Sequence, residues 1–409
     1  MMQKVQVVVI GGGIVGASVL FCLARKGWTD SVLLERRNLT SGSTWHAAGN
    51  VTFFGHYTAI TDLYIKSIET YQTASEESGQ EIGFHKTGSL RLANNREELA
   101  AYEALTPLYD RLDADYRVIL PKEIETIHPL LVTDGLFGAA YTPGDGHVDP
   151  TSSTNALAKA AKLRGAEIRT QTPAKTIRRT SSGWMIETED TTYLAKHVVI
   201  ATSFWAREML EPIGLNIPVY PIQHHEIISG PVAELQSLDF EVPAVRDPYA
   251  PSNTRQEGDG FLCGVYESDP KFWATDGIPP DFKEELLVPE LERLEEHLLR
   301  VIERIPAFGE AGIKKVNNGP MAYSPDGLPL LGPVKDMPGL WLATGFNIGI
   351  GTGGGSARFL AEWMNKGRPP YDLSIVYPSR YGNNITKDDA LARIHATYAK
   401  GYVTPQPPV

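Results

Sequence analysis

One pattern near the N-terminus constrains the fold more than any other part of the chain. The stretch Lys4–Arg36 reads KVQVVVIGGGIVGASVLFCLARKGWTDSVLLER. Its β-branched run Val5–Ile10 predicts a buried parallel strand, Ile14–Lys26 have the spacing of a helix, and Val32–Leu34 predict a second strand. The stretch is therefore predicted to form one βαβ unit, as in an α/β domain with a parallel sheet.

The turn in this unit has the glycine spacing of a dinucleotide-binding site. Gly11, Gly13 and Gly16 form G-x-G-x-x-G directly after the first strand. Gly11 permits the tight turn, Gly13 lets the backbone approach a pyrophosphate, and Gly16 lets the helix pack closely on the strand. The start of the helix offers free amide groups and a positive dipole end to the phosphates. Glu35, 19 residues after Gly16, is placed to accept hydrogen bonds from ribose hydroxyls.

A second glycine-rich segment decides between the dinucleotides. The first motif alone leaves FAD and NAD open, and Arg36 and Arg37 also leave NADP open. Trp341–Met364 predict a short strand, a glycine-dense turn and an amphipathic helix, with five glycines within Gly349–Gly355. A helix start with so few side chains suits a flat ring, and its dipole suits the negative charge that a reduced flavin gathers. A mobile loop is the alternative, but the two motifs together favour FAD.

The composition excludes several classes of function. The formal net charge is −11 and no run of five Lys or Arg occurs, which argues against a nucleic-acid partner. Cys22 and Cys263 are too few and too far apart for a disulfide framework or a zinc site, and we expect no metal. The nearly uncharged run Val7–Ala24 holds four glycines and is interpreted as a buried strand, turn and helix, not a membrane span. No targeting segment is visible, so we expect a cytoplasmic location.

The rest of the chain alternates between two kinds of segment. Further βα segments follow the first unit, whereas Glu81–Ala93, Val219–Ser229 and Gly258–Glu267 alternate like strands of an antiparallel sheet. Pro279–Pro306 predict a long charged helix. We predict an α/β fold (α+β overall), with a Rossmann-like FAD-binding domain assembled from separated segments and an inserted, mainly antiparallel β-sheet substrate domain. The predicted segments are 1–78, 143–215 and 315–385 for the FAD-binding domain, 79–142 and 216–314 for the substrate domain, and 386–409 for a loosely ordered C-terminal tail.

Short motifs along the chain resemble a known family. The motifs are VVIGGGIVGASV, LLERRNLTSGSTWHAAG, GFHKTGSLRLA, PGDGHVDP, FWARE, YSPDGLPLLGP and PSRYG. In order and spacing they are similar to the dimethylglycine dehydrogenase/sarcosine dehydrogenase family, within the FAD-dependent amine oxidoreductases that resemble D-amino-acid oxidase. The resemblance covers about residues 5–385, and STWHAAG is its most specific part.

The resemblance implies a role for His46, in GSTWHAAG. A lone histidine beside apolar residues is usually a core residue, but members with this segment carry FAD covalently attached through the histidine ring. A neutral imidazole nitrogen is a suitable nucleophile for such a bond. The candidate cofactor-binding residues are Gly11, Gly13, Ile14, Val15, Gly16, Glu35, Arg36, Gly42, Ser43, Thr44, Trp45, His46, Ala47, Ala48, Gly49, Ala174, Trp205, Asn347, Ile348, Gly349, Ile350, Gly351 and Thr352.

The resemblance also implies candidate catalytic residues, His224 in PIQHHE and Tyr266 in GVYE. Hydride leaves the carbon next to nitrogen only when the nitrogen lone pair is free, so the substrate ammonium must first lose its proton. A pair of polar side chains such as His224 and Tyr266 can accept or relay that proton. A solvent-facing His224 or His225 and a core Tyr266 are the alternatives. A substrate carboxylate needs a cation, and the sequence does not choose between Arg246 and Arg255.

This chain also departs from the family pattern. Glu226 replaces a tyrosine, Asn50 replaces an apolar residue, and Ser203 stands where glycine is usual. The expected pocket is therefore reshaped, and the exact substrate is left open. The sequence ends where the folate-binding half of the relatives would begin, so we expect an aldehyde to be released or passed to a separate folate-binding subunit.

The resulting expectation is an FAD enzyme that oxidises a secondary or tertiary amine. The favoured reaction is demethylation of an N-methylated amino acid such as dimethylglycine or sarcosine, by hydride transfer to flavin N5 and hydrolysis of the iminium. Oxygen or an electron-transfer protein would accept the electrons. The alternatives are an oxidase of another amine or amino acid, and a flavin-bearing subunit of a multi-subunit oxidoreductase.

Overall fold

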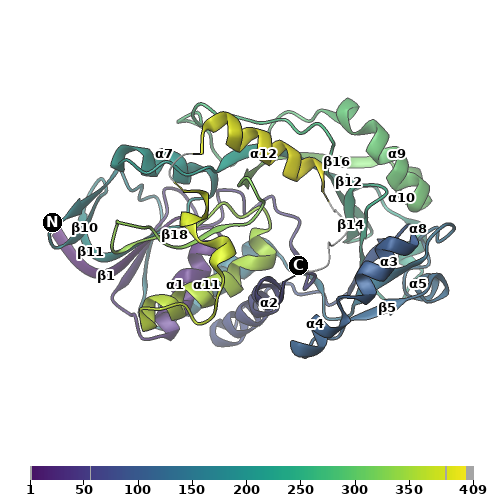
Figure 1. Cartoon of the computed structure of the whole chain (residues 1–409), viewed down its shortest axis with the longest axis horizontal. Helices are drawn as coiled ribbons and strands as arrows, with labels where there is room; N and C mark the ends of the chain where they lie inside the picture. Colours follow the sequence, from purple (N-terminus) through teal and green to yellow (C-terminus); the bar gives the residue numbers. More distant parts are fainter. Residues whose placement is uncertain (1, 56, 383–384, 402–409) are drawn as a thin grey trace.

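The computed structural model describes residues 2–55, 57–382 and 385–401, and it contains two eight-stranded sheets that lie side by side (Figure 1). The first sheet is mixed: its central strands are parallel, and β17, β9 and β10 join antiparallel to their neighbours. Its spatial order is β17-β18-β11-β1-β2-β8, with β10 and β9 attached through β11. The strands are β1 (Met2–Ile10), β2 (Ser31–Leu34), β8 (Glu167–Arg169), β9 (Thr176–Thr180), β10 (Gly183–Glu187), β11 (Thr192–Ile200), β17 (Leu330–Pro333) and β18 (Leu340–Thr344).

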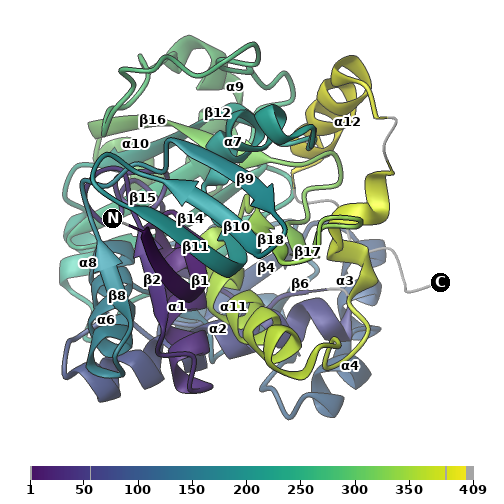
Figure 2. The same ribbon diagram turned by 90° about the vertical axis from the view of Figure 1, so that its left-hand side faces the viewer.

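Four helices pack together against this sheet, and their close approach depends on glycine. A Cβ at Gly355 of α11 would lie 2.0 Å from the Leu63 carbonyl oxygen of α2, and one at Gly354 would lie 2.9 Å from Ser67 Cα. The two helix backbones are therefore in direct contact. Figure 2 shows α1, α2 and α11 together below the sheet. The helices are α1 (Ile14–Arg25), α2 (Thr58–Ser78), α6 (Pro150–Leu163) and α11 (Gly349–Lys366).

The second sheet has the order β16-β12-β15-β14-β13-β4-β6-β5, and every pair except β13–β4 is antiparallel. The α/β fold with a mainly antiparallel second sheet is thus confirmed. The strands are β4 (Ser89–Ala93), β5 (Arg117–Ile119), β6 (Gly138–Thr142), β12 (Tyr220–Ser229), β13 (Ala244–Asp247), β14 (Ser252–Glu257), β15 (Gly260–Val265) and β16 (Ile313–Tyr323), and a separate pair is formed by β3 (Asn50–Val51) and β7 (Gly146–His147). The remaining α-helices are α3 (Arg96–Glu103), α4 (Thr106–Arg111), α5 (Pro121–Ile127), α7 (Ala206–Leu210), α8 (Ala233–Gln236), α9 (Glu295–Arg304), α10 (Pro306–Glu310) and α12 (Lys387–Ala399). Short 3₁₀ helices lie at Ser203–Trp205, Glu211–Ile213, Leu291–Leu294, Ser374–Val376 and Pro378–Tyr381.

The structure differs from the predicted organisation in three places. The helix predicted over Pro279–Pro306 is wrong: only α9, after one 3₁₀ turn, is α-helical, because Pro289 and the Pro279–Pro280 pair interrupt the earlier residues. Residues 315–323, placed with the cofactor domain, belong to β16 of the second sheet.

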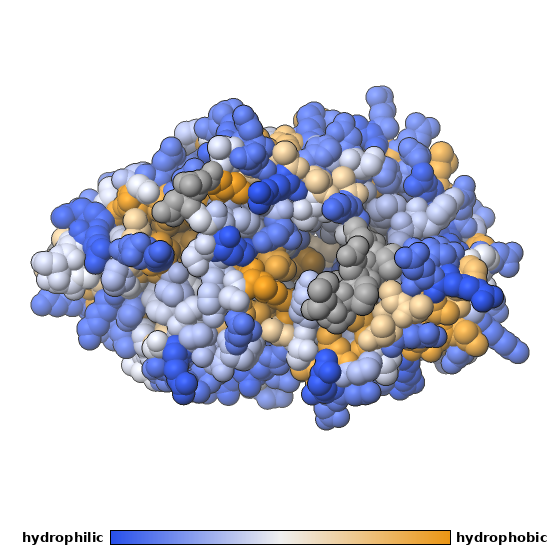
Figure 3. All heavy atoms as spheres, in the orientation of Figure 1, coloured by the Kyte–Doolittle hydropathy of each residue, from blue (hydrophilic) through white to orange (hydrophobic). Residues whose placement is uncertain are grey.

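The third difference concerns the C-terminal segment. Residues 387–399, predicted as part of a loose tail, form α12, and Tyr398 on this helix is fully buried. The rest of that prediction, residues 402–409, lies outside the described residues. Among the residues that are described, no helix is long and apolar enough to cross a membrane. The face of the molecule in Figure 3 is mostly hydrophilic, with one group of apolar residues near its centre.

Candidate active site

A cavity of about 490 Å³ lies between the two sheets and collects almost all the predicted site residues. Its walls come from the β1–α1 turn, the loop after β2, the segments after β11 and β18, and strands β12 and β16 of the second sheet. Both His224 and Tyr266 line it, as do all predicted cofactor-binding residues except four. The four that do not line the cavity are Gly16, Trp45, Gly351 and Thr352.

The β1–α1 turn has the shape that a pyrophosphate requires. Gly11 has φ +110°, and a Cβ there would lie 2.3 Å from the Ala201 carbonyl oxygen. A Cβ at Gly13 would lie 2.9 Å from Thr44 Oγ1, which accepts a 3.1 Å hydrogen bond from the Ile14 amide. Helix α1 has neither a side-chain cap on Gly13 nor an acidic residue in its first turn. Its start therefore keeps the positive character that binds phosphate.

Glu35 lies at the end of β2 and lines the cavity. Its carboxylate accepts 2.7 Å and 2.8 Å hydrogen bonds from the amides of Gly12 and Arg37, so the side chain is held in one orientation. Burial raises the pKa of Glu35, and these amides oppose the shift. The carboxylate has further lone pairs, which fits the expected bonds to ribose hydroxyls.

The opposite wall of this nucleotide end is formed by Arg36, Ala174 and Trp205. The Arg36 guanidinium lies over the Trp205 ring, 4.1 Å from its centroid, in a cation–π contact that holds both side chains in place at this end of the cavity. The residues fit the adenosine part of FAD, and this contact accounts for Arg36 without a 2′-phosphate.

The four predicted residues that miss the cavity act through packing. A Cβ at Gly16 would lie 1.9 Å from the Gly11 carbonyl oxygen, so this glycine permits the close helix–strand approach. Trp45 meets the His46 ring edge-on, with centroids 5.4 Å apart. Thr352 Oγ1 donates to the Ile348 carbonyl, and Gly351 leaves room for the Tyr64 ring.

His46 faces the cavity and packs against a glycine that the sequence did not single out. A Cβ at Gly319 of β16 would lie 2.4 Å from His46 Nδ1 and Cε1, so only glycine leaves room for the ring. Burial lowers the pKa of His46 to about 4. The imidazole is therefore neutral at pH 7, the form that can act as a nucleophile. The start of α11, at Ile348 and Gly349, also lines the cavity and has no side-chain cap.

His224 on β12 and Tyr266, which directly follows β15, lie together with ring centroids 4.7 Å apart. The solvent-facing alternative is wrong for His224 and for His225, which are 7% and 0% exposed, whereas Tyr266 lines the cavity and also packs its ring against the core cluster that contains Tyr398, so its catalytic role stays a prediction. Burial, together with nearby His225 and His46, lowers the pKa of His224 to about 3. His225 points elsewhere, and its Nε2 accepts a hydrogen bond from the Glu290 amide.

Several polar cavity residues were not assigned by the sequence. Arg246 lines the cavity, whereas Arg255 does not and instead donates to the Ala48 carbonyl oxygen. Glu226 lines the cavity as well, and burial raises its pKa to about 7 against the opposing influence of Arg255 and a hydrogen bond with Asn317. The alternation of β12, which places 224 and 226 on one face, is the signal that links Glu226 to His224. Asn317 and Asn253 complete this polar wall, and only the folded pairing of their strands brings them there.

Two departures from the family pattern have structural counterparts. Ser203 has φ +53°, a left-handed conformation that favours glycine. Its hydroxyl lies 3.1 Å from Ser43 Oγ, and its carbonyl accepts a 2.7 Å bond from Thr344, which holds the segment in place. Asn50 lines the cavity and donates to Asn253.

One cluster outside the cavity has potential metal ligands, His85, His147 and Glu241. The two imidazole rings are stacked with centroids 4.7 Å apart and planes within 8° of parallel. A ligand lone pair lies in its ring plane, and one ion cannot lie in two stacked planes at once. In this arrangement the pair is a packing contact.

The fold and cavity thus define a nucleotide-dependent redox protein, and the chain belongs to the FAD dependent oxidoreductase family, which it matches over residues 6–363. The curated relatives it resembles include the mitochondrial dimethylglycine dehydrogenase of Mus musculus, 38% identical over 97% of this chain and 46% of the relative, and the mitochondrial sarcosine dehydrogenase of Homo sapiens, 32% identical over 97% and 44%. The chain therefore spans about half the length of these relatives. Among solved structures, L-proline dehydrogenase from P. horikoshii has a TM-score of 0.80 and 26% identity, over 93% of this chain and 98% of that one.

Proposed function

We propose that this oxidoreductase oxidises a C–N bond of a secondary or tertiary amine, and that an N-methylated amino acid such as dimethylglycine or sarcosine is the substrate class. The observation that carries the proposal is the composition of the cavity, which joins a dinucleotide end to a polar end made of His224, Tyr266, Glu226 and Arg246. The names of the dimethylglycine and sarcosine dehydrogenases that it resembles support the same class.

The chain's residues divide the work between orientation and proton transfer. The β1–α1 turn, Glu35 and the start of α11 would hold FAD, which would supply the redox chemistry as the acceptor of a hydride from the carbon next to the substrate nitrogen. Arg246 pairs with the substrate carboxylate, because a guanidinium and a carboxylate form charge-assisted hydrogen bonds in a buried site. His224 is unprotonated at neutral pH and accepts the proton of the substrate ammonium. Water then hydrolyses the iminium to a demethylated amine and an aldehyde.

The decisive experiment is anaerobic flavin bleaching with matched amines. Dimethylglycine and sarcosine should bleach the visible flavin band. Glycine, which has no N-methyl group, tests whether that group is needed, and dimethylethylamine, which has no carboxylate, tests whether the carboxylate is needed. Arg246→Gln should raise the KM for dimethylglycine much more than that for dimethylethylamine. A wild-type enzyme that no N-methylated amine can bleach would show the proposed function to be wrong.

We also propose that FAD is bound covalently to His46. The support is a neutral imidazole that lines the cavity and is fixed between Gly319 and the edge of Trp45. Acid precipitation of the wild type should leave the yellow colour in the pellet, and His46→Ala should move it to the supernatant. Free flavin in the wild-type supernatant would rule out the bond.

The electron acceptor and the assembly need separate measurements. Admitting oxygen after anaerobic bleaching distinguishes an oxidase, which recovers its colour quickly, from a dehydrogenase that needs an electron-transfer protein. The second candidate function is a flavin-bearing subunit of a multi-subunit oxidoreductase. Turnover of an N-methylated amino acid by the purified chain alone would exclude it. A separate folate-binding partner and the cytoplasmic location stay predictions.

A further inference from the structure

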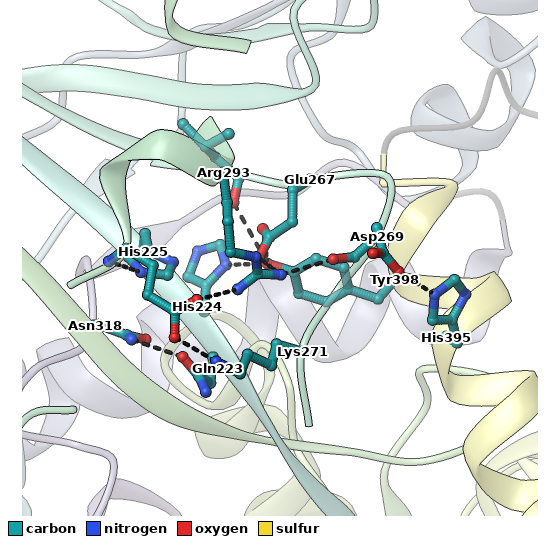
Figure 4. A network of polar contacts seen from close by, with 12 residues as sticks. Gln223, His224, His225, Glu267, Asp269, Lys271, Arg293, Asn318, His395 and Tyr398 are labelled. Carbon is teal, nitrogen blue, oxygen red and sulfur yellow. Dashed lines mark hydrogen bonds and ion pairs between the residues drawn. The ribbon is translucent and has the colours of Figure 1, made fainter. Parts of the chain in front are cut away.

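The C-terminal helix reaches the candidate active site through one side chain. Tyr398 of α12 is fully buried, and its hydroxyl lies 2.9 Å from Nδ1 of His224 (Figure 4). The same hydroxyl donates a 2.9 Å hydrogen bond to Oε2 of Glu267. The proposed function uses His224 but assigns no role to the two residues behind it.

This hydrogen-bonded chain connects two separate cavities. His224 lines the cofactor cavity, whereas Glu267 lines an outer pocket that also includes Asp269, whose side chain is 98% exposed. Arg293 lies between Glu267 and the exterior: its Nη2 is 3.3 Å from Glu267 Oε1 and donates to the Asp269 carbonyl oxygen. A buried polar path therefore runs from the substrate region to the surface.

The available protons fix the direction of each hydrogen bond. Glu267 pairs with Arg293 and, when ionised, can only accept hydrogen bonds. The Tyr398 hydroxyl lies 2.9 Å from Glu267 Oε2 and 3.4 Å from the Val265 carbonyl oxygen, so we assign its single proton to the nearer, charged acceptor, and the Tyr398 oxygen then accepts from His224 Nδ1–H. A neutral imidazole that carries its proton on Nδ1 has its lone pair on Nε2. The chain is thus set to receive a proton at Nε2.

We infer that His224, Tyr398 and Glu267 form a proton relay that carries the proton of the substrate ammonium from the cofactor cavity to the outer pocket; this inference rests on the proposed function. The substrate N–H bond breaks and a His224 Nε2–H bond forms, while the Nδ1 proton moves to Tyr398 Oη and the Tyr398 proton moves to Glu267. No electrons are gained or lost. An ammonium and a carboxylate become an amine and a carboxylic acid, and the acid then loses its proton to water.

The groups around the path favour passage of the proton through His224 to Glu267 over its retention on His224. His224 is faced by His225, His46 and the rings of Tyr266 and Tyr398, and its lowered pKa means that an imidazolium does not persist. Burial raises the pKa of the Glu267 carboxyl, while Arg293 opposes that shift and Asp269 adds to it. The proton therefore finds a more favourable site on Glu267 than on His224.

Tyr398→Phe tests the relay because it removes one oxygen and keeps the buried ring. With an N-methylated amino acid in anaerobic stopped-flow, flavin reduction at pH 7 should slow by about 100-fold, the lower range for a lost proton-transfer group. The rate should recover to within about threefold of wild type at high pH, where the amine is already unprotonated. Glu267→Gln should behave alike, and His395→Gln, an exposed change on the same helix, should match wild type.

The outcomes separate the relay from a purely structural role. An unchanged pH profile in Tyr398→Phe would overturn the relay, and so would an equal loss at all pH values. A second readout needs no turnover: in ¹⁵N-histidine spectra, with His224 assigned by comparison with His224→Gln, the wild type should show the Nδ1–H tautomer. An Nε2–H tautomer overturns the relay even if no amine is oxidised, whereas failure of bleaching with the expected tautomer contradicts only the proposed function.

Discussion

Gly319→Ala is expected to displace the His46 ring. The added Cβ would lie 2.4 Å from two ring atoms, and ordinary van der Waals contact needs about 1 Å more. The strand backbone at 319 is paired with His224 in the β12–β16 ladder and cannot retreat easily, so the imidazole must move by about 1 Å. Overpacking of this kind costs about 1–3 kcal/mol.

A double-mutant cycle isolates this contact. Gly319→Ala should lower the free energy of unfolding by about 1–3 kcal/mol in the presence of His46, and by much less in the His46→Ala background, where the space is vacant. Urea titrations of all four proteins, each with excess FAD, measure the difference. The flavin retained by acid-precipitated Gly319→Ala should also fall, because the nucleophilic nitrogen has moved.

The cycle has a clear refuting result. If Gly319→Ala costs the same free energy in both backgrounds, the cost does not arise from the imidazole. If it costs nothing and retains wild-type flavin, the tight packing of β16 on His46 is wrong.

Three further perturbations test other parts of the structure. Burial lowers the pKa of His128 to about 4, whereas its value in the unfolded chain is about 6.5. The unfolded chain therefore binds a proton that the folded protein does not, and the free energy of unfolding falls as pH drops below 6.5. Between pH 7 and pH 5, urea titration should show the wild type losing about 2 kcal/mol more than His128→Gln. Thr44→Val removes the hydroxyl that accepts from the Ile14 amide and should cost about 1 kcal/mol in the same assay; no change would show that this bond does not stabilise the helix start. Gly16→Ala would place a Cβ 1.9 Å from the Gly11 carbonyl oxygen, so the purified protein should carry little flavin by absorbance, and full occupancy would contradict the close packing.

The elements that were predicted well are those whose signal is local. The strand, turn and helix from Val5 to Lys26 differ from the observed β1 and α1 by only a few residues, because periodicity and glycine spacing are both contained in the segment. The long charged helix predicted over Pro279–Pro306 is wrong, because its prolines interrupt the first half of the segment and only Glu295–Arg304 is α-helical. Helix α12, which carries Tyr398, has 13 residues but buries only Ala390, Ile394 and Tyr398, so its apolar pattern in the sequence is weak.

Within the site, the distinction is the same. Gly11, Glu35 and His46 belong to motifs that can be read in one stretch, and all three line the cavity. Gly319 comes to lie beside the site only when β16 pairs with β12. Glu267 becomes linked to the site only when α12 packs back and Tyr398 donates its hydrogen bond to it. No spacing in the linear chain encodes these contacts.

The separation of β1 and β18 in the sequence has a consequence during protein synthesis. Both strands flank β11, yet β1 ends at Ile10 and β18 begins at Leu340. At typical translation speeds of about 5–20 residues per second, roughly 15–60 s pass between the appearance of the two strands. Strand β11 ends at Ile200, so the part of its edge that β18 later pairs, Val198–Ile200, is open only while residues 201–340 are made, whereas the face of α1 that α11 later buries is uncovered from the time α1 appears. The first sheet and its helix layer therefore cannot be completed until β18 and α11, which begin at Leu340 and Gly349, have been made.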